Sequence, residues 1–369
     1  MSWHEHIKRA NAETEQRGRR RVIPFLRGSG HLFTTEDGHR LVSFASNDYL
    51  GLATHPDVVA AAHGALDAYG SGAGSARLIV GAREIHRELE EELASFKGSE
   101  EALLFPSGYS ANLGVLSALG TEDVLICSDE LNHASIVDGC RLARARVAVF
   151  PHRNLDALAA LLTGHDGPAI VVTDTVFSMD GDIAPLEGLI EVCERHGALL
   201  VLDEAHAVLG PHIPEVPGVG ILRVGTLSKF LGSAGGYVTG DAASIEFLVN
   251  RARSFIFTTA GTPADAASAL AALRILGSPE GTQLVSRLRS LVERVAPGHR
   301  SPIIPFIVGS EAEALAASQR LRERGLLVPA IRPPSVPDGM SRLRVTLSAA
   351  HTDEQVDDLV AALSEIGGG

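Results

Sequence analysis

The chain has 369 residues, of which 45% are hydrophobic and 21% charged, and its formal net charge is −13. This composition is typical of a globular protein with one sizeable core and a smaller domain. The acidic balance argues against a protein that binds nucleic acid or a membrane surface, and no apolar run reaches the length of a transmembrane helix.

The cysteines and the first residues indicate the compartment. Cys127, Cys140 and Cys193 have no paired spacing, which indicates free thiols rather than metal ligands or a disulfide framework. Residues 1–21 are charged throughout and lack the apolar core of a signal peptide. We therefore expect a cytoplasmic protein.

The first hundred residues predict helices around two short strands. Trp3, Ile7 and Ala10 recur at helical spacing and predict an amphipathic helix over residues 3–17. The other predicted elements here are strands at 32–34 and 41–43 around a turn, and helices at 56–69 and 83–96.

From about residue 100, short apolar runs alternate with helical patterns. Strands separated by helices imply an α/β fold with a mostly parallel sheet covered on both faces. Ligands bind such sheets beyond the carboxyl ends of the strands. The predicted strands are 102–105, 124–127, 147–150, 169–173, 198–202, 221–224 and 237–239.

The last third of the chain has a different pattern. Residues 262–276 and 282–295 predict one long, interrupted helix. Strands at 303–308, 326–329 and 343–347 then alternate with helices at 311–323 and 353–366, which predicts a smaller α/β domain. We expect an N-terminal helix with short strands over 1–45, a large domain over 46–280 and a small domain over 281–369.

One acid and one lysine stand out in the large domain. Asp203 ends the apolar run 199–202, and Lys229 follows it by 26 residues, beside Thr226 and Ser228. Pyridoxal 5′-phosphate (PLP) chemistry requires such a pair, because the lysine forms a Schiff base and the acid pairs with the protonated pyridine nitrogen. Taken alone, the pair fits equally well a strand-end Asp that caps a loop and an unrelated surface lysine.

A phosphate site is predicted where a strand meets a helix. Ser107 can cap the helix that follows, which leaves the amides of Gly108 and Tyr109 facing outward, as in helix N-termini that bind phosphate. A purely structural cap is the alternative. The Gly-rich run 70–75 follows a helical pattern and not a strand, which disfavours a Rossmann dehydrogenase.

Three further side chains are candidates for contact with a planar cofactor. His133 can stack on its ring, and His206 and Ser178, near strand ends, can hydrogen-bond its phenolic oxygen. A metal site is the less favoured alternative, since the candidate ligands lie on different strands and a lysine follows. Those ligands would be His133, Asp174, Asp203, Glu204 and His206.

The order of several motifs resembles that of the α-oxoamine synthases. These are fold-type-I PLP enzymes that condense an amino acid with an acyl thioester and release carbon dioxide. The resemblance extends from Trp3 to His351 and implies a large PLP-binding domain with a smaller C-terminal α/β domain. The motifs are Asn47-Asp48-Tyr49-Leu50-Gly51, Ser107-Gly108-Tyr109-Ser110-Ala111-Asn112, Asn132-His133-Ala134-Ser135, Val176-Phe177-Ser178-Met179-Asp180-Gly181-Asp182, Asp203-Glu204-Ala205-His206 and Thr226-Leu227-Ser228-Lys229.

Within that family the chain resembles most the biotin-pathway branch. The Met-Ser-Trp opening and the runs 330–337 and 342–351 carry this likeness. It implies condensation of L-alanine with a pimeloyl thioester, carried by coenzyme A or by an acyl carrier protein. A related synthase such as glycine C-acetyltransferase is the alternative. A non-catalytic paralogue is disfavoured because Lys229 and Asp203 are both present.

The resemblance also implies catalytic and substrate-binding roles. Lys229 would hold PLP and act as general base, with Asp203 on the pyridine nitrogen, and His133 or His206 would polarise the thioester. The expected substrate-binding residues are Asn47, Arg344, which would bind the amino-acid carboxylate, Thr346, and Arg20 or Arg21, which would meet the distal carboxylate of the acyl chain or the phosphates of its carrier.

The expected cofactor contacts include a segment from a second subunit. Thr258 and Thr259 resemble the segment that reaches the phosphate of the neighbouring subunit, which implies a homodimer. The complete set of expected cofactor contacts is Ser107, Gly108, Tyr109, His133, Ser178, Asp203, His206, Thr226, Lys229, Thr258 and Thr259.

The chain also departs from the family pattern. Ala207-Val208-Leu209 stands where the family usually has Gly-rich residues, the stretch 210–224 is short, and Ala73 is an extra residue in the Gly-rich run. We expect these changes to alter the loop near the cofactor and the fit of the acyl chain.

Overall fold

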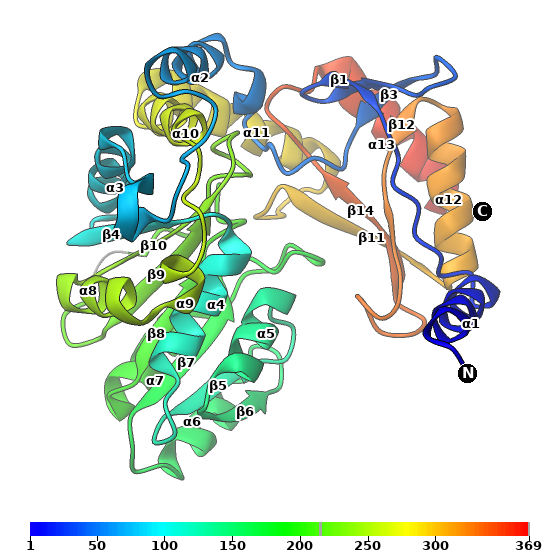
Figure 1. Cartoon of the computed structure of the whole chain (residues 1–369). Coiled ribbons are helices and arrows are strands. Elements are labelled where there is room, and N and C mark those ends of the chain that lie inside the picture. The colour runs from blue at the N-terminus through cyan, green and yellow to red at the C-terminus, as the bar shows by residue number, and fades with distance from the viewer. Residues whose placement is uncertain (214–215, 368–369) are drawn as a thin grey trace.

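The computed structural model describes residues 1–213 and 216–367, and its largest element is a seven-stranded sheet (Figure 1). β10 is antiparallel to both of its neighbours, and the other adjacent pairs are parallel, which confirms the predicted mostly parallel sheet. In spatial order the strands are β4 (Glu101–Phe105), β10 (Gly236–Gly240), β9 (Ile221–Thr226), β8 (Leu199–Asp203), β7 (Ala169–Asp174), β5 (Leu125–Asp129) and β6 (Arg146–Phe150).

Helices cover both faces of this sheet, and neighbouring residues of a strand serve opposite cores. In β8, Val201 packs into one core while Leu200 and Leu202 pack into the other. This alternation is the period of two that a strand buried on both faces requires. One face carries α4 (Gly108–Leu119), α5 (Ala134–Leu142), α8 (Ala242–Arg251) and α9 (Arg253–Ile256), and the other carries α6 (Leu155–Thr163) and α7 (Leu186–His196).

The second part of the molecule contains two smaller sheets (Figure 1). In β14, Leu343 and Val345 are buried in the core, so Arg342, Arg344 and Thr346 lie on the opposite face of the strand. The three-stranded sheet contains β11 (Ile303–Gly309), β14 (Ser341–Thr346) and β13 (Ala330–Ile331), with α12 (Glu311–Glu323) and α13 (Asp353–Gly367). The four-stranded sheet contains β1 (Arg27–Ser29), β2 (Leu32–Thr34), β3 (Arg40–Ser43) and β12 (Leu326–Leu327).

Two predicted elements differ from the structure. The long interrupted helix is two helices, because Gly277 ends the first and Ser278 caps the second ahead of Pro279. The predicted strand 326–329 is shorter, because β12 ends at Leu327; the next strand, β13, begins only at Ala330 and pairs with a different sheet. The linking elements are η1 (Leu52–Thr54), α2 (Pro56–Tyr69), η2 (Arg77–Gly81), α3 (Glu84–Lys97), α10 (Pro263–Leu276) and α11 (Pro279–Val295).

The N-terminal helix α1 (Trp3–Gln16) has the predicted position, but its apolar residues are not covered. None of its residues is buried, and Trp3 is 77% exposed. Arg19, just beyond the helix, pairs with Glu311 of α12 at 2.8 Å and ties this end of the chain to the smaller part of the molecule.

Within the described ranges, no helix is both long and apolar enough to cross a membrane. The division of the chain at residues 45 and 280 stays a proposal; β3, from the first segment, pairs with β12 from the last.

A buried ion network joins α3 to the central strands. Lys97 Nζ lies 2.6 Å from Glu204 Oε2, and Arg223 Nε lies 3.5 Å from Glu204 Oε1. All three side chains are buried. The Glu204 carboxylate outweighs burial and raises the pKa of Lys97, so this lysine remains an ammonium ion.

Replacement of Lys97 should therefore destabilise the protein. Lys97→Met removes one charge and leaves Glu204 underpaired in a dry environment, and we expect a loss of roughly 3 kcal/mol in the free energy of unfolding. Urea denaturation measures this. Glu204→Met should be destabilised more than Lys97→Met, because it removes the carboxylate that the buried Lys97 and Arg223 cations share; equal or smaller destabilisation would show that the pairing is not the cause.

Candidate active site

The polar residues converge where three parallel strands end. The register aligns Asp174 of β7 with Asp203 of β8, and Asp203 with Val224 of β9. Lys229 follows the end of β9 by three residues. Parallel pairing thus brings the acid and the lysine, 26 residues apart in sequence, to one edge of the sheet.

Lys229 begins a chain of hydrogen-bonding groups. Its Nζ lies 2.9 Å from Nε2 of His206, and Nδ1 of His206 lies 2.6 Å from the hydroxyl of Tyr49. The Tyr49 hydroxyl donates to Oδ1 of Asn47 at 3.1 Å. Burial, together with the charge of Lys229, lowers the pKa of His206 well below its usual value, so its imidazole is neutral.

The surroundings of Lys229 lower its pKa, which favours proton transfer to its amine. Burial lowers the pKa of Lys229, and the positive charge of Arg344 lowers it further, while Asp203 and Asp174 act in the opposite direction. The net shift is downward, so a larger fraction of the amine is unprotonated at neutral pH than in a solvated lysine.

Asp203 is held rigidly through both carboxylate oxygens. Oδ2 accepts a hydrogen bond from Nδ2 of Asn112 at 2.6 Å, and Oδ1 accepts one from the amide of Ala205 at 2.9 Å. Asn112 also donates to Oγ of Ser135 at 2.9 Å. The carboxylate is therefore oriented before any ligand binds.

His133 lies at the N-terminus of α5 with its ring exposed. Its amide donates to Oδ2 of Asp174 at 2.7 Å, and its Nδ1 lies 2.7 Å from Oγ of Ser135. Burial and the nearby Asp203 raise the pKa of Asp174 well above its ordinary value. The ring of His133 is thus fixed in position while one side remains accessible.

The predicted phosphate site depends on a close backbone approach. Ser107 caps α4, and the backbone of Ser107 and Gly108 passes directly over Gly236, where a Cβ atom would overlap Ser107. Beyond it, a Cβ on Gly108 would lie 3.3 Å from Cβ of Thr226. The free amides of the helix and the Thr226 hydroxyl consequently lie close together.

Arg344 enters from the smaller sheet. Its guanidinium is buried, with Nε donating to the carbonyl of Ser178 at 2.5 Å and an Nη donating to Oδ1 of Asn47 at 3.3 Å. Thr346 is on the same face of β14, and its buried Oγ1 has no hydrogen-bond partner among the described residues. This face therefore offers a cation and an unused hydroxyl to a ligand.

The donor set fits PLP. The lysine would bind the aldehyde of that cofactor, and the buried, oriented carboxylate would pair with its pyridine nitrogen. The serine-capped helix N-terminus would hold its phosphate, and the exposed imidazole would lie on the face of its ring. The missing Cβ at Gly236 keeps the Ser107–Gly108 amides beside Thr226, as a phosphate cradle requires.

Other predicted residues lie apart from this cluster. Arg21 lines a groove formed with Arg19 and residues 330–335, which shares no residue with the cluster, and Arg20 pairs with Glu15 at 3.1 Å. Tyr109 is exposed and donates to Asp138 at 2.5 Å.

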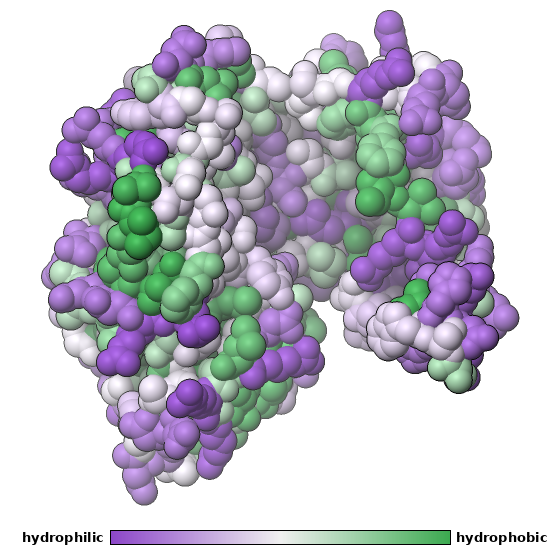
Figure 2. Space-filling model, in the orientation of Figure 1, coloured by the Kyte–Doolittle hydropathy of each residue, from purple (hydrophilic) through white to green (hydrophobic). Residues whose placement is uncertain are grey.

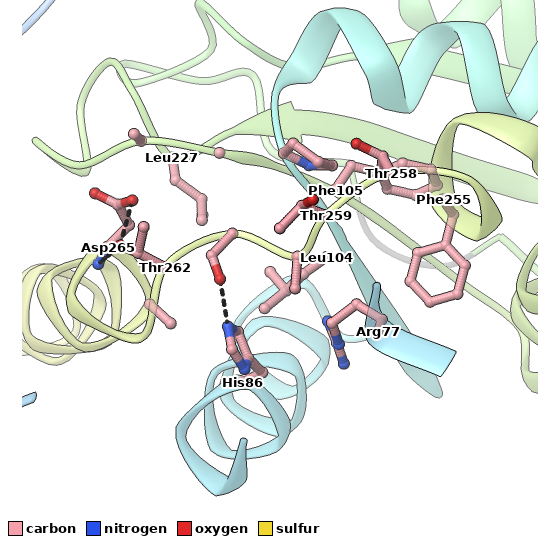
Figure 3. A pocket seen from close by; sticks show the side chains of 16 residues that line it. Arg77, His86, Leu104, Phe105, Leu227, Phe255, Thr258, Thr259, Thr262 and Asp265 are labelled. Atoms are coloured by element: carbon pink, nitrogen blue, oxygen red, sulfur yellow. Dashed lines mark hydrogen bonds between the residues drawn. The ribbon is translucent and has the colours of Figure 1, made fainter. Parts of the chain in front are cut away.

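Thr258 and Thr259 line a small cavity beside Phe105 and Leu227 of their own chain (Figure 3). The cavity volume is about 20 Å³, which admits a water molecule and not a substrate. The role of these threonines toward a second subunit stays a prediction.

Several contributors to the site were not singled out in the sequence. Asn112 and Tyr49 lie inside recognised motifs, and only their contacts with Asp203 and His206 reveal what they do. The sequence pattern indicates Asp174 only as a possible metal ligand, whereas in the structure it accepts a hydrogen bond from the amide of His133. Gly236 begins an apolar strand, and nothing in its neighbours indicates that Ser107 passes over it.

One departure from the family pattern directly follows a residue of the site. Ala207 and Val208 are buried directly after His206, and Ala73 is buried as well. Within the short stretch 210–224, residues 214–215 lie outside the described part of the chain. The effect of these changes on acyl-chain fit stays a prediction.

Comparison with known proteins gives the same assignment as the geometry. The model of the aminotransferase class I and II family matches residues 39–363. The chain is 50% identical to the 8-amino-7-oxononanoate synthase of Anaeromyxobacter dehalogenans, over 89% of this chain and 87% of that one. It is 45% identical to that of Burkholderia vietnamiensis, over 97% and 94%. A variant of serine palmitoyltransferase from S. paucimobilis with a bound PLP–myriocin aldimine has a TM-score of 0.90 and 28% identity, covering 98% and 97%.

The close approach at Gly236 predicts a cofactor-binding defect. Gly236→Ala should push the Ser107–Gly108 backbone away from Thr226, and we expect PLP affinity to fall at least tenfold while the fold persists. Fluorescence titration of apoprotein with PLP measures this. Gly240→Ala, on the same strand and away from Ser107, should retain PLP affinity; equal losses in both variants would point to general damage to β10.

Proposed function

Because the chain belongs to the aminotransferase class I and II family, and within it to the family of 8-amino-7-oxononanoate synthases, we propose that it condenses L-alanine with a pimeloyl thioester. The reaction releases carbon dioxide and a free thiol and supplies 8-amino-7-oxononanoate for biotin biosynthesis. The protein is a PLP-dependent acyltransferase. The observation that carries the proposal is the convergence of Lys229, Asp203 and Arg344 on one sheet edge.

The residues proposed to hold PLP surround that edge. Lys229 would bind it covalently, Asp203 would pair with its ring nitrogen and His133 would lie on its face. PLP supplies an electron sink for the carbanion that forms beside the amino nitrogen of the amino acid. The remaining proposed contacts are Ser107, Gly108, Tyr109, Ser178, His206, Thr226, Thr258 and Thr259.

Arg344 is the proposed receptor for the carboxylate of L-alanine. Its guanidinium has more donors than its two described acceptors, the Ser178 carbonyl and Asn47, use. The buried hydroxyl of Thr346 lies on the same face. A carboxylate held there would remove the cost of a buried cation and orient the Cα–H bond of the amino acid.

Lys229 is the proposed base for the Cα proton. Its lowered pKa favours the unprotonated amine that accepts this proton. His206 Nε2, 2.9 Å away, is a neutral partner that can hold Nζ in position without competing as a charge. His206 or His133 would then polarise the thioester carbonyl.

The acyl donor is proposed to approach past the basic groove near α1. Arg19, Arg21 and Arg332 line this groove. Arg21 and Arg20 are exposed, and one of them would meet the distal carboxylate of a pimeloyl chain or the phosphates of its carrier. Coenzyme A and an acyl carrier protein both present such phosphates.

A homodimer in the cytoplasm is the proposed state. Exposed apolar side chains of η2, among them Ile79 at 73%, lie beside α9, and Phe257, just after α9, is 70% exposed. Figure 2 shows hydrophobic surface on this side of the molecule. A second copy would cover it. The three cysteines are unpaired and buried, which supports a reducing compartment.

A substrate panel tests the proposed reaction. L-Alanine, glycine and L-serine would each be combined with pimeloyl-, acetyl-, succinyl- and palmitoyl-coenzyme A, and thiol release recorded. We expect selective release with L-alanine and the pimeloyl thioester, and none from Lys229→Ala, which should remain folded. Selectivity for another pair would overturn the substrate assignment, and turnover by Lys229→Ala would overturn the mechanism.

Subunit mixing tests the shared site. If Thr258 and Thr259 serve the neighbouring subunit, Lys229→Ala and Thr258→Ala/Thr259→Ala should each have less than a tenth of native activity. Mixed dimers would regain activity, because one of their two sites has a native lysine and native threonines. Sedimentation establishes that both variants dimerise. Dimers that show no gain on mixing would contradict the shared site.

A further inference from the structure

The segment between β7 and α7 connects the two sides of the active site. Val176 and Ile183 form an isolated antiparallel bridge that closes the segment. Inside it, the amide of Phe177 donates to the carbonyl of Asp182 at 3.0 Å, and the amide of Gly181 donates to that of Phe177 at 2.8 Å. These bonds make a compact loop, here called the 177–182 loop.

The smaller sheet holds one side of this loop. Arg344 donates through Nε to the carbonyl of Ser178 at 2.5 Å, and the buried Arg342 pairs with Asp180. Gly181 lies so close to β11 that a Cβ atom would overlap the carbonyl of Ile303. The orientation of the Arg344 guanidinium therefore depends on where the loop places the Ser178 carbonyl.

The large sheet holds the other side through one histidine. His152, two residues beyond β6, has Nε2 2.8 Å from Oδ2 of Asp182 and Nδ1 3.0 Å from Oδ1 of Asp129. Its ring packs edge-on against Phe177 with centroids 4.4 Å apart. The two carboxylates outweigh partial burial and raise the pKa of His152 to about 9, so both ring nitrogens donate at neutral pH.

We propose that His152 is a positioning residue that sets the affinity for the amino-acid carboxylate. By fixing Asp182 to Asp129, it anchors the 177–182 loop to the large sheet, and the loop presents the Ser178 carbonyl that orients Arg344. This inference rests on the proposed function, because Arg344 is the proposed carboxylate receptor.

The physical reason is the geometry of a guanidinium fork. The carbonyl of Ser178 occupies Nε and Asn47 engages one Nη, so the remaining N–H groups point in fixed directions. A guanidinium forms two parallel hydrogen bonds to a carboxylate only when its remaining N–H groups point at both carboxylate oxygens. Loss of the His152 anchor would displace the loop and, with it, the guanidinium of Arg344. Binding of the amino-acid carboxylate would then weaken by the equivalent of about one hydrogen bond to a charged group.

Binding of L-alanine to PLP-loaded protein, followed by its visible absorbance change, tests this. His152→Gln should weaken L-alanine binding about tenfold, the equivalent of one such hydrogen bond. The affinity for PLP and the KM for the pimeloyl thioester should stay within twofold, since neither depends on Arg344. Asp182→Asn is a second, isosteric variant with the same expectation.

His165→Gln is the matched control. His165 is half-buried and lies 3.1 Å from the carbonyl of Pro168, away from the 177–182 loop. We expect native affinities in this variant. A comparable loss of L-alanine affinity there would mean that any lost histidine contact has this effect, which would overturn the proposal.

The Arg344→Lys background separates positioning from general structural support. If His152 acts through Arg344, adding His152→Gln to Arg344→Lys should change L-alanine affinity by less than twofold. A further tenfold loss, or unchanged affinity in both His152→Gln and Asp182→Asn, would overturn the proposal and leave the proposed function intact. Absence of any L-alanine response in the native protein would overturn the proposed function, and this inference with it.

Discussion

Parallel pairing of β7, β8 and β9 is the constraint on which the rest of the structure depends. Three chain segments leave the same edge of the sheet, and each carries polar side chains into the space beyond it. The hydrophobic cores on both faces hold the strands in register. Asp203 and Lys229 therefore meet without any local sequence signal that joins them, and the fold supplies the proximity that the chemistry requires.

The site also depends on a balance of charges within a buried volume. Arg344 lowers the pKa of Lys229, whereas the acids Asp203 and Asp174 act in the opposite direction. His206 stays neutral among them. These charges act on one another across a short distance, so a change to one of them alters the pKa values of Lys229 and His206.

The sequence predicted the features that follow local rules. Strand ends and helix starts are visible as apolar runs and capping residues, so the positions of Asp203, Lys229 and Ser107 could be predicted. The end of β12 at Leu327 could not, because an apolar run does not reveal that the chain leaves one sheet there and joins another at Ala330. Gly236 and His152 were missed for a similar reason, since their partners lie more than 20 residues away.

The contact between Asn47 and Arg344 has a consequence for biosynthesis. The two residues are 297 positions apart. Close by, the amide of Thr346 donates a hydrogen bond to the carbonyl of Phe44, and the hydroxyl of Ser348 donates one to the carbonyl of Asp48. At translation rates of 5–20 residues per second, the N-terminal partner waits roughly 15–60 s for the C-terminal one. During that interval Asn47 and its neighbours lack their C-terminal partners, so this part of the pocket can form only near the end of synthesis.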